Sequence, residues 1–168
     1  MKPETATLMN ESDRGCVIVA AVILEKRLVD DLTSIFKLNE LSNRYIAHMF
    51  DGNGALGNFS SKVLLARGIG LISEDVFHDL MVVRKMRNEF AHSLNDISFL
   101  DPAVKGRIDS MFFARQAKEI MRGIPAFNLS DNMEGEAVFS YKSIFCVAVK
   151  NMEVYLLESR ALRAGLKI

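Results

Sequence analysis

The sequence predicts an all-α protein, a single-domain bundle of five to seven helices. Apolar residues recur every three or four positions along most of the chain, and no segment of useful length alternates with the two-residue period of a strand. Only three prolines are present, and the interiors of the expected helices are nearly free of glycine. These observations favour helices that pack on helices around one core.

The expected domain covers residues 14–168, after a loose N-terminal arm over residues 1–13. Its first helix is expected at residues 14–37, where the apolar positions follow helical spacing and the polar ones fall on the opposite side. These apolar positions are Val17, Ala21, Leu24, Leu28, Leu32 and Ile35. A second helix is expected over residues 39–49, with Asn39 as its cap. The glycine-rich loop DGNGALGNFS follows.

Recognisable start signals place the later helices. Asn58 or Ser60 can cap one helix, and Ser73, followed by two acidic residues, begins another. Asp101-Pro102 is a further start, with proline at the first helical position. The four later helices are therefore expected at residues 58–67, 73–92, 101–122 and 136–160.

The composition narrows the functional classes. The chain has 168 residues with 21 Lys+Arg and 21 Asp+Glu, so it lacks the basic excess that is typical of nucleic-acid binders. The longest apolar run, residues 16–24, is about half of a membrane span. We expect a cytoplasmic protein with no membrane segment. Cys16 and Cys146 lie in apolar runs and are expected to be free buried thiols.

Two motifs match known sites in letters but not in context. Residues 52–57 read G-x-G-x-x-G, yet the preceding stretch is helical rather than the strand that a dinucleotide site needs. We therefore interpret them as a tight connection with positive φ at its glycines. Residues 66–76 imitate helix-turn-helix spacing, but the second helix opens with acids that would repel phosphates. A calcium-binding loop that begins at Asp51 is excluded, because Lys62 occupies the twelfth position, where such a loop needs a bidentate glutamate.

No cofactor or metal site is expected, since the three histidines and two cysteines show no zinc-ligand spacing.

The segment RKMRNEFAHS is the strongest candidate site. Arg84, Asn88 and His92 share one helical face, with Arg87 one step round. These four side chains could clamp a phosphate or contact a partner, and the histidine could move a proton. The structural alternative is a histidine that favours the negative end of the helix dipole, beside an arginine that pairs or caps.

The segments CVIVAAVILEKRLVDDL, FDGNGALGNFSSKVLLARGIGLIS and DLMVVRKMRNEFAHS resemble the mannitol operon repressor family of bacterial proteins. The resemblance covers about residues 17–108. It implies an all-helical transcriptional repressor without a recognisable DNA-reading motif. Such a protein would act through a partner, such as a transcription factor or a regulatory protein of sugar transport, or through DNA contacts that the sequence does not show.

The six residues RNEFAH also resemble the R-x(4–6)-H signature of the HEPN superfamily, whose members are helical bundles and often metal-independent RNA endonucleases. Carried over, Arg87 and His92 form the signature pair and Asn88 takes the polar position after the arginine. Three hypotheses therefore stay open: a non-enzymatic homodimeric regulator, a ribonuclease or toxin-like protein, and a scaffold in which the polar turn stabilises a subunit interface. Surplus apolar helix surface motivates the homodimer.

Overall fold

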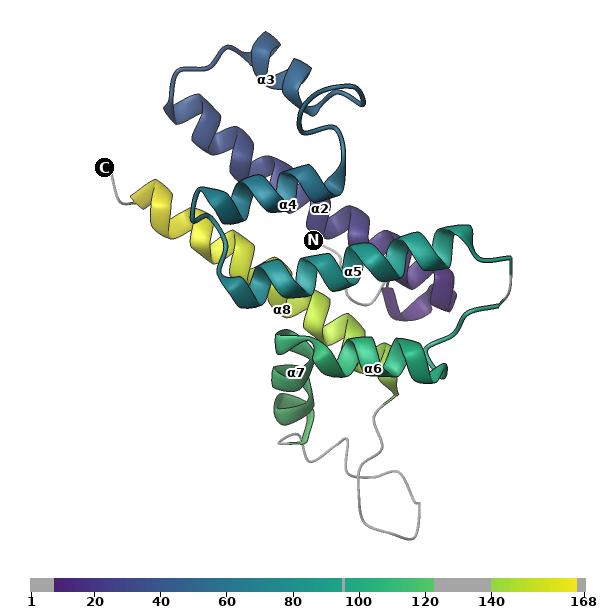
Figure 1. Cartoon of the computed structure of the whole chain (residues 1–168). Coiled ribbons are helices and arrows are strands. Elements are labelled where there is room, and N and C mark those ends of the chain that lie inside the picture. Colours follow the sequence, from purple (N-terminus) through teal and green to yellow (C-terminus); the bar gives the residue numbers. More distant parts are fainter. Residues whose placement is uncertain (1–7, 95, 123–139, 166–168) are drawn as a thin grey trace, which may run out of the picture.

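The computed structural model describes residues 8–94, 96–122 and 140–165, with side chains up to residue 159. Within these ranges it contains helices and no strand, which confirms the all-α prediction. A short helical turn at residues 8–10 precedes the longer elements (Figure 1). These are α2 (Asp13–Leu38), α3 (Asn43–Phe50), α4 (Phe59–Gly68), α5 (Glu74–His92), α6 (Pro102–Ser110), α7 (Phe112–Arg122) and α8 (Tyr141–Gly165).

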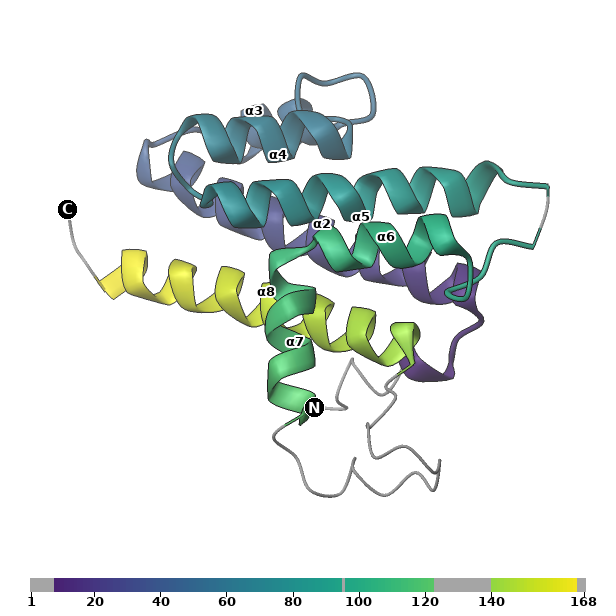
Figure 2. The ribbon, with the colours of Figure 1, turned by 60° about the horizontal axis from the view of Figure 1, so that its bottom comes forward.

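The helices are arranged in layers around α2, the longest element. α2 packs against both α5 and α8, and α4 covers α2 and α5 on the side away from α8. Figure 2 shows α3 and α4 above the pair α2 and α5, with α8 below them. α7 crosses the direction of the other helices and packs on α8.

The core follows from the apolar stripe of α2. Its buried side chains recur at three- and four-residue intervals, so α5 and α8 can both pack on them. Full burial of each Leu or Val contributes roughly 1.5–3 kcal/mol. Phe90, Phe99 and Phe145 join α5, the following loop and α8, with ring centroids 6.1 and 5.4 Å apart. Leu8 is also part of this core, at 2% exposure. The boundary of an N-terminal arm at residue 13 stays a prediction.

The second helix begins later than predicted. Asn39 ends α2 instead of starting α3: its side-chain amide donates to the carbonyl of Ile35 at 2.9 Å. Glu40 then adopts a left-handed backbone conformation, with φ 60°, and a right-handed α-helix cannot continue through such a residue. Ser42 is the true N-cap of α3, because its hydroxyl accepts from the backbone N–H of Tyr45.

The helix predicted over residues 101–122 is two helices. The chain is extended at Met111, with φ −73° and ψ 135°, and α7 starts anew at Phe112. The buried carboxylate of Asp79, in α5, accepts from the backbone N–H groups of Phe112 and Phe113. A distant acid therefore stabilises a helix start that no local signal marks.

The glycine-rich loop is a tight connection, as predicted, but for a different reason. Of the described glycines, Gly70 has a positive φ, whereas those between residues 52 and 57 do not. Gly54 and Gly57 are instead required for space. A Cβ atom at Gly54 would lie 2.3 Å from the backbone oxygen of His48, and one at Gly57 would lie 2.5 Å from that of Asp51. The chain folds back on the end of α3 too closely for a side chain.

The predicted caps of α4 and α5 and the predicted state of the two cysteines agree with the structure. Asn58 caps α4 and Ser73 caps α5. The expected start of the last helix near residue 136 lies outside the described residues, and α8 continues to Gly165 rather than ending near residue 160. Cys16 and Cys146 are free and buried. In the described part of the chain, no helix has the length and apolarity needed to span a membrane.

Candidate functional site

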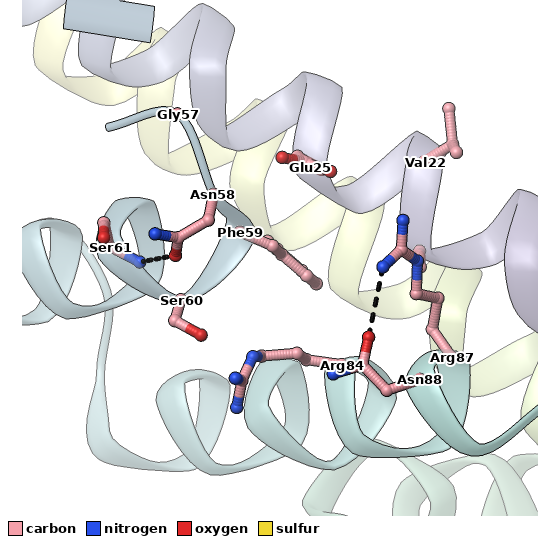
Figure 3. Close-up of a pocket in the computed structure, with 11 residues that line it drawn as sticks. Val22, Glu25, Gly57, Asn58, Phe59, Ser60, Ser61, Arg84, Arg87 and Asn88 are labelled. Carbon is pink, nitrogen blue, oxygen red and sulfur yellow. Dashed lines mark hydrogen bonds between the residues drawn. The ribbon is translucent and has the colours of Figure 1, made fainter. Parts of the chain in front are cut away.

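A pocket of about 650 Å³ opens between α2, the start of α4 and the middle of α5 (Figure 3). Three of the four side chains singled out in RKMRNEFAHS line it, namely Arg84, Arg87 and Asn88. The remaining walls come from two other regions of the chain. These are Ala21, Val22 and Glu25 of α2, and residues 57–61 before and within the first turn of α4.

The α5 wall presents two guanidinium groups. Arg84 extends toward the α4 side of the pocket, whereas Arg87 reaches toward α2 and Val22 (Figure 3). Arg87 Nη1 donates a 3.1 Å hydrogen bond to Asn88 Oδ1, which fixes the amide oxygen on the arginine and leaves the amide N–H groups as donors. The wall therefore offers donors from three neighbouring side chains.

The α4 wall is a helix N-terminus. Asn58 Oδ1 accepts from the backbone N–H of Ser61 at 2.9 Å, which is the usual N-cap bond. Ser60 adds a hydroxyl that lines the pocket (Figure 3). The positive end of the α4 dipole thus lies on the same pocket as the two arginines.

The acid on the α2 wall already has a partner. Glu25 Oε1 lies 2.6 Å from Lys62 Nζ, and Lys62, on α4, is buried. Among the described residues that line the pocket, Glu25 is the sole acid. Because Lys62 neutralises it, the charges of Arg84 and Arg87 dominate the electrostatic potential of the pocket.

A second hollow, of about 400 Å³, lies on the other flank of α5. Arg84 and Asn88 line it as well, so these two residues form a ridge between both hollows. Glu89 closes this side and pairs with Arg107 of α6. The lining of this second hollow is more apolar than that of the first pocket, because Met81 and Val82 contribute to it.

His92 lies apart from this cluster. It is exposed at the end of α5 and lines neither hollow. The carbonyl oxygen of the adjoining C-cap residue, Ser93, accepts a hydrogen bond from Arg14 Nη2 at 2.9 Å. Neither of these two hollows therefore brings Arg87 and His92 together, as a phosphodiester-cleaving pair would need. Among the described residues, no group of three or more metal-ligating side chains comes together.

Sequence reasoning found the α5 wall and missed the other two. The three-to-four spacing of Arg84, Arg87 and Asn88 suffices to place them together, because one helix carries all of them. Nothing local indicates that α2 and the start of α4 face them. The sequence predicts Asn58 as a cap of α4, but a cap does not indicate which helix lies opposite it.

The architecture defines an all-α protein of the helical-bundle class. Comparison with known proteins gives the family: the chain belongs to the mannitol repressor family, whose model matches residues 7–140. The mannitol operon repressors of Escherichia coli K12 and of Escherichia coli O6:H1 are each 26% identical to it over 94 residues. That match covers 55% of this chain and 48% of each relative, so it spans about half the length of these proteins.

A solved structure shares the fold. A chain of the X-ray structure of the MtlR–HPr complex from Escherichia coli matches with a TM-score of 0.61 and 16% identity, covering 88% of this chain and 92% of the other. At this identity the likeness concerns the fold. The comparisons give no support to the HEPN ribonuclease alternative.

Proposed function

We propose that this chain is a non-enzymatic transcriptional regulator of the mannitol-repressor type that acts by binding a protein partner. The similarity to a structure solved as a complex with HPr carries the proposal, because that neighbour shares nearly the whole fold. Membership of the mannitol repressor family supports the regulatory role. HPr is accordingly the first partner to test.

The surface chemistry of α4 and α5 supports action without a helix-turn-helix reader. The sequence spacing of such a unit falls on α4 and α5, but the first turn of α5 exposes Glu74 and Asp75. Glu74 pairs with Arg67, which removes one of the cations nearby. Phosphates would be repelled where a recognition helix normally enters the groove. The cations further along α5, half-buried Arg84 and exposed Arg87, together with Asn88 and His92, are the proposed partner contacts.

Isothermal titration calorimetry of the purified chain with HPr from the same genome tests the proposal. We expect saturable binding that weakens on Arg87→Glu, whereas the control Arg115→Glu, on exposed α7 surface, leaves the affinity unchanged. Gel-shift assays with operator DNA are expected to show no complex with the chain alone. Absence of HPr binding, together with direct retardation of DNA, would overturn the proposal.

A homodimer forms part of the proposal. Several large apolar side chains on α3 and α4 are exposed, and a second copy would shield them from water. These are Tyr45, Leu64 and Ile69. Light scattering after size-exclusion chromatography distinguishes a dimer from a monomer, and Leu64→Glu is expected to shift the mass toward the monomer.

A further inference from the structure

We infer that the pocket between α2, α4 and α5 binds a small phosphate ester whose remaining part carries hydroxyl groups. The inference goes beyond the proposed function, because binding of a small molecule can be measured without a partner protein, although Arg84, Arg87 and Asn88 serve in both proposals. It rests on the juxtaposition of Arg84 and Arg87 in one concave site whose acid, Glu25, is already neutralised by buried Lys62.

The charge of the site selects an anion. Two guanidinium groups line the same pocket, and each can give two parallel N–H bonds to a phosphate. Lys62 lies behind the wall, 2.6 Å from Glu25, so the single acidic side chain of the lining is paired. In a chain of zero formal net charge, this concentration of positive charge is local rather than general.

The shape of the site selects a small molecule over a flat macromolecular surface. Its volume of about 650 Å³ lies within the range of small-ligand pockets, and it is much larger than a phosphate ion needs. Three helices from separate parts of the chain enclose it (Figure 3). A ligand with a substantial body beyond the phosphate therefore fits better than an inorganic anion alone.

The remaining lining selects a polar body. Ser60, Ser61 and the amides of Asn58 and Asn88 lie around the pocket (Figure 3), and Phe59 and Val22 give it limited apolar surface. Hydroxyl groups of a polyol or sugar can exchange hydrogen bonds with these side chains. An aromatic or lipid body would leave them unsatisfied, at a cost in affinity. The ligand class is therefore a phosphorylated polyol or sugar.

Calorimetric titration with glucose 6-phosphate tests the inference, with glucose and inorganic phosphate as separate probes. We expect glucose 6-phosphate to bind, phosphate to bind more weakly, and glucose to give no heat of binding. Because the contact is ionic, raising the salt concentration should weaken it. The absence of binding at millimolar concentrations of all three probes, in low salt, would overturn the inference.

Two variants test whether the ligand binds in the pocket or is attracted by surface charge in general. Arg84→Gln is expected to weaken binding of glucose 6-phosphate by about tenfold or more, since a charge-assisted pair is lost. Arg67→Gln removes the same charge from exposed surface outside the pocket and should leave the affinity unchanged. Equal effects of the two variants would overturn the inference. Thermal unfolding of both variants checks that each is folded, and HPr titration reports separately on the proposed function.

Discussion

The carboxylate of Asp79 accepts a hydrogen bond from the backbone N–H of Phe113 at 2.9 Å, across 34 positions of sequence. Its other oxygen accepts from Phe112 at the same distance. Asp79 is fully buried within α5, so these two bonds replace water around its charge. The first turn of α7 is thereby fixed to the middle of α5, and α7 in turn packs on α8.

Replacement of Asp79 should therefore destabilise the protein well beyond an ordinary surface change. Asp79→Ala leaves two backbone N–H groups without their acceptor, and we expect the free energy of unfolding to fall by roughly 2–4 kcal/mol. The control Asp75→Ala removes an exposed acid from the first turn of α5 and should cost less than about 1 kcal/mol. Urea unfolding monitored by circular dichroism measures both, and similar losses would show that Asp79 does not cap α7.

The same acid shows where sequence reasoning was incomplete. Residues 101–122 carry a continuous helical apolar pattern, and Ser110 and Met111 give no strong stop signal. The break depends on an acceptor from another helix, and periodicity within a segment holds no information on such contacts. Nothing in the sequence marks Asp79 as this acceptor, and its side chain is completely buried.

The candidate site was likewise predicted only in part from the sequence. Arg84, Arg87 and Asn88 were predicted to lie together because helical geometry alone decides it, and they do share a pocket. His92 was expected with them at i+8, but it lies at the end of α5 and does not line the pocket. The α2 and α4 walls depend on how helices pack, and the pairing of buried Lys62 with half-buried Glu25 has no sequence signature.

The loop between α3 and α4 offers a matched pair of glycine substitutions. Gly54→Ala would place a methyl group 2.3 Å from the His48 oxygen, whereas Gly52→Ala meets nothing within 4 Å. Relief of the first clash requires a backbone shift, so we expect a loss of more than about 1 kcal/mol in unfolding free energy. Gly52→Ala should be near neutral. Equal melting temperatures for the two variants would contradict the close approach of the chain at Gly54.

The two cysteines are expected to form an intramolecular disulfide under a mild oxidant. Their sulfur atoms lie 3.6 Å apart, joining α2 to α8. The hydrogen bond from Cys16 lowers the pKa of the Cys146 thiol, while that bond and burial raise the pKa of Cys16. Cys146 is thus the expected thiolate that attacks first.

Diamide is the oxidant for this test. Its N=N bond accepts the two electrons and two protons that the thiols lose, and a disulfide remains. Intact-mass spectrometry should show the loss of two hydrogen atoms without cross-linked dimers, and Cys146→Ser should not form the bond. Two titratable thiols in the denatured protein after prolonged treatment would contradict the prediction.

The Lys62–Glu25 pair is expected to set the charge of the inferred ligand pocket. Lys62→Met frees the Glu25 carboxylate to repel an anion, so the affinity for glucose 6-phosphate should fall by roughly fivefold. The double variant Glu25→Gln/Lys62→Met removes both charges and should restore most of it. Methionine is similar in length to lysine and fills the buried site, so the double variant, which leaves no unpaired charge, should change stability little. If calorimetry gave Lys62→Met and the double variant the same affinity, Lys62 would have no electrostatic role at the pocket.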